Sequence, residues 1–115
     1  MIIEYYRDQD LEKLREDVVL AHKSLSKEFS DIKVNYDGWH PEYPENYNDT
    51  WILVTLMERY GYHSYYYDTV LYTSEFQEFD NTENITGDGL TFNQAVCNMF
   101  VKYFLEYERR ITRKP

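Results

Sequence analysis

A long amphipathic pattern near the end of the sequence restricts the fold more than any other feature. Between residues 91 and 111, apolar side chains recur at steps of three and four, which places them on one face of an α-helix. Thr91 and Gln94 have the spacing of a capping box, in which the hydroxyl and the amide each satisfy an exposed N–H group. Other elements of the chain have to cover this face. Its members are Val96, Met99, Phe100, Tyr103, Phe104, Tyr107 and Ile111.

Two further segments are predicted to be helices. Residues 8–29 carry an apolar stripe at the same spacing, and Asp8 or Asp10 can accept hydrogen bonds from the first turn. In residues 50–60 apolar side chains cover most of the circumference, so this helix is expected to lie in the core. Gly61 is expected to be its left-handed C-terminal residue.

The segment before the last helix favours β-strands. Residues 62–67, 69–73 and 75–79 are rich in aromatic and β-branched side chains, and we expect two or three antiparallel strands there. Residues 80–89 are expected to form a polar loop. Three helices packed on a small antiparallel sheet make an α+β fold, which we predict to be a single domain over residues 1–115.

The predicted core joins the apolar faces of the three helices. Cys97 lies on the apolar side of the last helix and is expected to be a small core residue rather than a nucleophile. His22 is expected to face water on the first helix. The predicted core residues are Leu14, Val18, Trp51, Leu53, Leu56, Met57, Val96, Met99, Phe100 and Phe104.

Cysteine content and hydropathy indicate the compartment. The chain has one cysteine, which cannot form a disulfide within the chain and suits a reducing cytoplasm. No charged segment followed by an apolar one opens the sequence, and the longest apolar runs are far shorter than a membrane span. We therefore expect a protein of the cytoplasm that does not contact the membrane.

The net charge of −9 is concentrated in the middle of the chain. Residues 36–88 contain eleven acidic side chains and one basic one, Arg59, whereas residues 89–115 contain two acidic and five basic side chains. An acidic surface repels nucleic acid and anionic membranes and attracts basic proteins. The basic residues near the C-terminus complement the dipole of a helix end, so we expect no direct binding of nucleic acid.

Catalytic and metal-binding signatures are absent from the sequence. The three histidines have no partners at metal-ligand spacing. Asp80, Thr82 and Asn84 have the alternate spacing of a calcium loop, but Ile85 and Thr91 stand where that loop needs glycine and glutamate. We predict no metal, no cofactor and no enzymatic activity. A small hydrolase that uses a pair of carboxylates is the least favoured alternative.

One stretch and its continuation resemble a known family. Residues 47–61 read YNDTWILVTLMERYG, and residues 95–100, beyond the aromatic strands, read AVCNMF. This order is similar to the phage ABA-sandwich domain family over about residues 44–105, although bulky side chains stand where the family's last helix has alanines. The resemblance implies an α+β fold and a phage or mobile-element source. The family has no assigned activity, so the resemblance implies no catalytic residues.

Tyrosines and acids together suggest a binding surface. Nine of the 13 tyrosines lie between positions 36 and 72. Side chains alternate along a strand, so one face of the sheet is expected to pack under the helices and the other to expose rings among carboxylates. Tyrosine gives a large contact area at a small cost in conformational entropy. The predicted partner-binding residues are Tyr65, Tyr67, Tyr72, Asp68, Glu75, Glu78, Asp80, Glu83, Asp88, Asp37, Glu42 and Glu45.

These patterns predict a non-enzymatic acidic binding protein, and the resemblance implies that a phage or mobile element encodes it. It is expected to occupy the basic, nucleic-acid-binding surface of a host defence protein in the host cytoplasm, as anti-restriction and anti-CRISPR inhibitors do. The alternative is a structural or regulatory phage accessory protein that self-associates, for example as a homodimer, through an aromatic face of the sheet.

Overall fold

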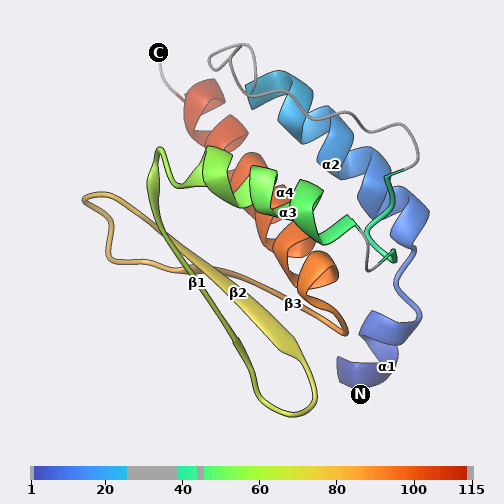
Figure 1. Ribbon diagram of the computed structural model, residues 1–115. Helices are drawn as coiled ribbons and strands as arrows, with labels where there is room; N and C mark the ends of the chain where they lie inside the picture. The colour runs from blue at the N-terminus through green and yellow to red at the C-terminus, as the bar shows by residue number, and fades with distance from the viewer. Residues whose placement is uncertain (1, 26–38, 44–45, 114–115) are drawn as a thin grey trace.

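The computed structural model describes residues 2–25, 39–43 and 46–113. In this part of the chain it shows four helices and one antiparallel sheet of three strands (Figure 1). The predicted α+β class is confirmed, but there is one helix more than expected. This helix, α1, is short and has Glu4 in its first turn and Arg7 in its last, where each charge matches the helix dipole. In chain order the elements are α1 (Ile2–Arg7), α2 (Leu11–Leu25), α3 (Tyr47–Met57), β1 (Gly61–Tyr67), β2 (Tyr72–Glu78), β3 (Ile85–Gly89) and α4 (Phe92–Arg113).

The predicted caps of two helices are confirmed. At α2, the carboxylate Oδ1 of Asp10 accepts a hydrogen bond from the backbone N–H of Lys13 at 3.1 Å. At α4, the hydroxyl of Thr91 accepts one from the backbone N–H of Gln94 at 3.1 Å, and the Gln94 side chain accepts one from the Leu90 N–H at 2.8 Å. The end of the first predicted helix, residues 26–29, lies outside the described residues.

The sheet has the strand order β1-β2-β3, and both pairs are antiparallel. The predicted segments 69–73 and 75–79 are in fact a turn followed by one strand, β2. The loop predicted at 80–89 is wrong for its second half, because Ile85–Gly89 forms β3. The sequence ITGDG has few strand-forming side chains, so this strand depends on its pairing with β2 and its packing against α4.

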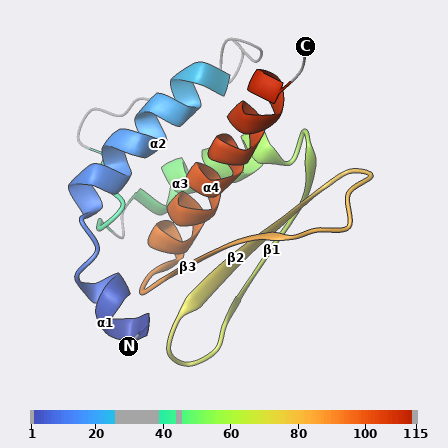
Figure 2. The same ribbon diagram turned by 180° about the vertical axis from the view of Figure 1, so that it is seen from behind.

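The helices that pack on the sheet, α3 and α4, lie on the same face of it. Helix α4 packs on β2 and β3, α3 packs beside it over the start of β1, and α2 covers α4 on the side away from the sheet (Figures 1 and 2). No described element covers the opposite face of the sheet, which is called the open face below. No helix within the described ranges is long and apolar enough to cross a membrane.

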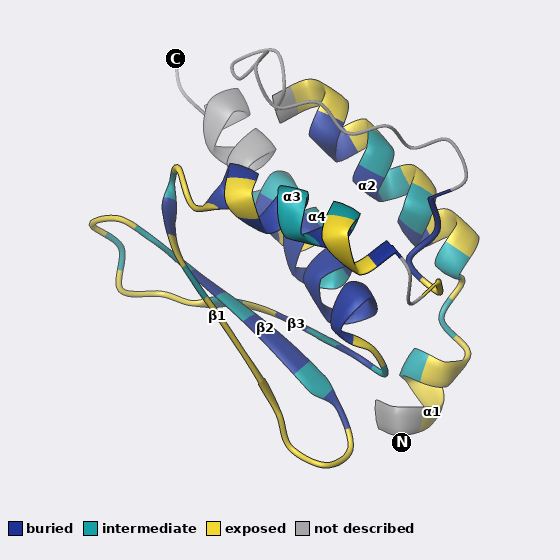
Figure 3. Ribbon diagram, in the orientation of Figure 1, coloured by how far each residue is buried: buried dark blue, intermediate teal, exposed yellow. Residues whose placement is uncertain are grey.

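The core lies between the sheet, α4 and the two helices that flank it, as the dark blue segments in Figure 3 show. Eight of the ten predicted core residues are buried, and Trp51 and Phe104 are partly buried against the same cluster. Cys97 is also buried, as predicted. The expectation for His22 is wrong, because this side chain is only 4 % exposed. The buried face of α2 therefore includes His22 in addition to the apolar residues of the stripe.

Two glycines allow close contact between backbones. Gly87 lies where β3 meets α4, and a Cβ atom there would overlap the backbone of Met99 and of Ala95. Gly61 was expected to be a left-handed helix end, but it is the first residue of β1 and its φ is not in the left-handed region. A Cβ atom on Gly61 would overlap the carbonyl oxygen of Gln77 in β2, so close strand packing explains this glycine.

Candidate functional site

Both faces of the sheet expose tyrosine rings. Alternation along β1 places Tyr65 and Tyr67 on the face toward the helices and Tyr62 and Tyr66 on the open face. The ring of Tyr65 lies 5.9 Å from that of Trp51 in α3, which confirms its direction. All four tyrosines are between 48 and 69 % exposed. They remain exposed because β1 is an edge strand and the β1–β2 hairpin extends beyond the helices (Figure 1).

Aromatic rings from α3, β1 and α4 meet at one end of the helix-facing side. Phe92, the first residue of α4, is 7 % exposed and lies at the centre of this group. Its ring centroid is 5.0 Å from Tyr47, 5.0 Å from Tyr65 and 5.2 Å from Trp51. The tilted and edge-to-face arrangements of these rings are the favourable ones for aromatic pairs. The walls that they form are therefore held in place by packing.

A pocket of about 380 Å³ opens beside these rings. It is called the aromatic pocket below. The ring of Tyr72, which lines the pocket, stacks on that of Tyr67 at 4.6 Å. Tyr67 is therefore in contact with the pocket lining without being part of it. The pocket brings together Glu42, Tyr65 and Tyr72, three of the predicted partner-binding residues. Its aromatic lining consists of Tyr47, Tyr65, Tyr72 and Phe92, and its polar lining consists of Glu42, Thr91 and Asn93.

The polar side chains of the aromatic pocket are hydrogen-bond acceptors. Asn93 is 4 % exposed, and its Nδ2 donates to the carbonyl of Tyr43 at 3.0 Å, which fixes the orientation of the amide. The Oδ1 of Asn93 is buried and has no hydrogen-bond donor among the described residues. Glu42 is exposed, and its carboxylate lies 4.0 Å from Nδ1 of His40. A buried acceptor without a donor is costly, so a ligand with N–H groups would stabilise this arrangement.

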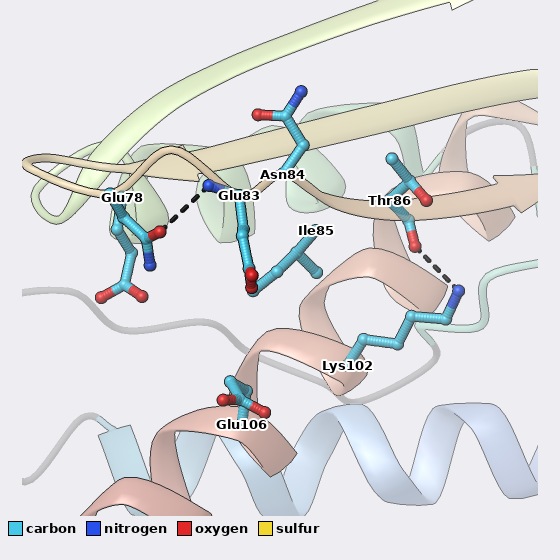
Figure 4. Close-up of a pocket in the computed structure, with 8 residues that line it drawn as sticks. Glu78, Glu83, Asn84, Ile85, Thr86, Lys102 and Glu106 are labelled. Carbon is cyan, nitrogen blue, oxygen red and sulfur yellow. Dashed lines mark hydrogen bonds between the residues drawn. The ribbon is translucent and has the colours of Figure 1, made fainter.

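A second pocket, of about 370 Å³, lies between the β2–β3 connection and α4 (Figure 4). Among the residues that line it are Glu78 and Glu83, two more of the predicted partner-binding residues, together with Glu106. Lys102 is the one basic residue in this lining, and its ammonium donates to the carbonyl of Thr86 at 2.8 Å. No group of acidic, histidine or cysteine side chains in the described ranges has the arrangement of a metal site. The acids here contribute negative charge to the surface.

Two predicted acids make hydrogen bonds that hold the sheet and its first turn. The Oδ1 of Asp68 accepts from the backbone N–H of Leu71 at 2.8 Å and of Val70 at 3.0 Å. These two bonds lower the pKa of Asp68, and they hold the turn between β1 and β2. The Oδ1 of Asp88 in β3 accepts from the hydroxyl of Thr73 in β2 at 2.8 Å. Both carboxylates therefore have a structural role as well as a charge.

The other predicted acids are spread over the molecule. Glu75 points to the open face of the sheet, opposite the aromatic pocket. Asp80 is in the turn after β2 with a φ of 64°, a backbone conformation that aspartate tolerates better than most residues. Asp37 and Glu45 lie outside the described residues. The acids thus surround the sheet rather than converge on one point.

A serine and a histidine are in hydrogen-bond contact within the core side of the sheet. Nε2 of His63 lies 2.6 Å from Oγ of Ser74, and the Ser74 hydroxyl donates to Sδ of Met99 at 3.0 Å. Burial lowers the pKa of His63, although the charge of Glu58 opposes this. Since the hydroxyl proton is used for Met99, the neutral ring donates from Nε2. Ser74 is fully buried, so its oxygen is not accessible to a substrate and the pair stabilises the sheet.

Sequence reasoning did not identify Tyr47, Phe92 or Asn93 as site residues. Phe92 and Asn93 belong to the first turn of α4, and Tyr47 opens α3, so these residues are far apart in the sequence. Phe92 was the one signal in the sequence for this site. It is a large apolar residue directly after the helix cap and lies before the apolar stripe of the helix begins.

Comparison with protein-family models, with curated proteins and with solved structures finds no match to this chain.

Proposed function

We propose that this protein is a non-enzymatic binding protein that uses its acidic, tyrosine-rich sheet to bind a basic surface of a partner protein. The observation that supports this best is the charge of the sheet. Residues 61–89, which include all three strands and their turns, contain six acidic side chains and no lysine or arginine. Electrostatic attraction of this kind guides the encounter of two proteins and excludes partners of like charge.

The exposed rings of β1 supply contact area on both faces of the sheet. Tyr62, Tyr65, Tyr66 and Tyr67 are each about half exposed or more. Tyrosine is enriched at the centres of protein interfaces because its ring is large and has few rotatable bonds. The tyrosines of β1 therefore add aromatic contact area to both faces of an acidic sheet.

The specific form of the proposal concerns the partner. A groove that binds nucleic acid presents the positive charge that this sheet complements. We therefore propose a nucleic-acid-binding protein of a host defence system as the partner, and an inhibitor encoded by a phage or mobile element as the role. Its place of action would be the host cytoplasm.

The test is capture of partners from a host lysate, followed by binding kinetics with the purified partner. The variant Glu75→Lys, Glu83→Lys changes two acids of the sheet region. The control variant, Asp8→Lys, Glu16→Lys, makes the same change of charge on exposed residues near and on α2. We expect the sheet variant to slow association and weaken its dependence on salt, and the control to leave both close to the original protein. Equal effects of the two variants would refute a role for the sheet.

Self-association is the second candidate, and the free edge of β1 favours it. Strand β1 pairs only with β2 in the described part of the chain, and its sequence GYHSYYY has no acidic, lysine or arginine side chain. Such an edge can pair with a second copy of itself. A dimer in sedimentation experiments that disappears in Ser64→Lys would favour this candidate, because a lysine on an edge strand discourages pairing.

A further inference from the structure

We propose that the aromatic pocket binds the guanidinium group of an arginine side chain from the partner protein. This inference rests on the proposed function, since it names the group of the basic partner that enters the pocket. The pocket volume of about 380 Å³ is at the low end of the range for small-ligand sites. A single side chain fits a site of this size.

The rings of the pocket suit a flat cation. A guanidinium group is attracted to the face of an aromatic ring when it lies within about 6 Å of the ring centre. Tyr47 and Tyr65 both lie 5.0 Å from Phe92, so a cation beside one of these rings is close to a second. Arginine is preferred to lysine in such places because its planar group stacks on rings and is less strongly hydrated.

Two hydrogen-bond acceptors belong to residues that line the pocket. Glu42 supplies a negative charge in the lining of the pocket. Asn93 supplies an Oδ1 that has no donor among the residues described. That oxygen is covered in the present arrangement, so the exposed carboxylate of Glu42 is the acceptor that a ligand meets first. Tyr47 and Tyr65 are 43 and 48 % exposed, so their rings are accessible to a ligand as well.

The charge of the pocket lining favours an arginine within a protein chain over free arginine. None of the residues that line the pocket is basic, so an anion has no counter-charge there. The carboxylate of free arginine would be repelled by Glu42, whereas an arginine within a peptide chain has no such group. The acidic sheet beside the pocket also favours further basic residues of the same partner.

The experiment is an NMR titration of the ¹⁵N-labelled protein with blocked tripeptides of sequence Gly-Arg-Gly, Gly-Lys-Gly and Gly-citrulline-Gly. Citrulline has nearly the same shape as arginine but carries no charge. We expect the arginine peptide to bind about fivefold more tightly than the lysine peptide, and the citrulline peptide to bind more weakly than either. The side-chain amide signal of Asn93 should shift during the titration, because this residue lines the pocket.

Matched variants separate the pocket from the rest of the sheet. Tyr65→Leu should weaken binding of the arginine peptide about tenfold, whereas Tyr66→Leu, on the next residue and the opposite face, should leave it unchanged. Glu42→Gln should weaken binding, and Glu75→Gln on the open face should not. Equal losses in both members of either pair would overturn the assignment of the site.

An oligolysine peptide and free L-arginine distinguish this inference from the proposed function. Binding of oligolysine to the sheet, with no response of the pocket to the arginine peptide, would overturn the inference and leave the proposed function standing. Equal binding of the arginine and lysine tripeptides in the pocket would overturn the preference for guanidinium. Tighter binding of free arginine than of the blocked peptide would overturn the partner protein as its source. No binding of any cationic peptide would count against both proposals.

Discussion

Replacement of Gly87 by alanine tests the least expected element of the fold, strand β3. An added Cβ atom would overlap the backbone of Met99 and Ala95, and these atoms belong to α4. A flexible side chain could move aside at little cost, but the backbone in the middle of a helix cannot. The strand itself has to move away from α4, which weakens its pairing with β2 and opens the core beside Phe76.

The cost of this change follows from its mechanism. Overpacking of a tight contact typically lowers the free energy of unfolding by about 1–3 kcal/mol, and rigid neighbours place Gly87→Ala at the upper end of that range. For a domain of this size, such a loss lowers the melting temperature by about 10 °C. The control is Thr86→Ala, the preceding residue of β3, which is exposed and should change the free energy of unfolding by less than about 0.5 kcal/mol.

Thermal unfolding followed by circular dichroism measures both variants, and hydrogen exchange of the β3 amides shows where the change acts. Gly87→Ala should lose protection in β3 before α4 is affected. A melting temperature equal to that of the original protein would mean that β3 does not lie against α4 in this register. The position of Asp88 and the edge of the sheet would then be wrong as well.

Three further predictions concern the core and its buried groups. Phe100→Ala should lower the free energy of unfolding by about 3–5 kcal/mol in chemical denaturation, because this ring is fully buried. Burial lowers the pKa of His22 and of His63, so the unfolded chain takes up protons more readily than the folded one. Stability should therefore be constant above about pH 6.5 and fall as the pH drops below it, and melting curves from pH 7.5 to 5 measure this. Burial raises the pKa of the Cys97 thiol, so a thiol reagent should react with it only after unfolding, and rapid modification of the folded protein would contradict its place in the core.

Three of the four helices in the described ranges were predictable because their information is local. The spacing of Leu14 and Val18, and the cap formed by Thr91 and Gln94, lie within a few residues of each other in the sequence. Strand β3 was not predictable in this way, since Gly87 and Gly89 have no strand preference of their own. Its conformation results from contacts with β2 and α4, which the sequence pattern of residues 85–89 does not contain.

In the candidate site too, local features were predictable from the sequence and long-range contacts were not. Alternation along β1 predicts correctly that Tyr65 and Tyr67 share a face, because this depends only on strand geometry. It does not predict that Phe92 and Asn93 join Tyr65 around a pocket, because their meeting depends on where α4 crosses the sheet. The number of acidic residues predicts the charge of the surface. It does not predict that the carboxylate of Asp68 accepts backbone hydrogen bonds and so holds a turn.

Partner binding and self-association use different groups of the same strand, so they can be separated. Pairing with a second copy uses the backbone N–H and C=O groups along the free edge of β1, whereas the aromatic pocket uses a ring that projects from its helix-facing side. Ser64→Lys should therefore abolish any dimer and leave binding of the arginine peptide unchanged. Tyr65→Leu should weaken binding of the arginine peptide and leave any dimer intact. Sedimentation and the NMR titration measure the two properties on the same samples. If either substitution changes both properties together, the edge and the pocket form one surface, and a second copy of the chain competes with the basic partner for it.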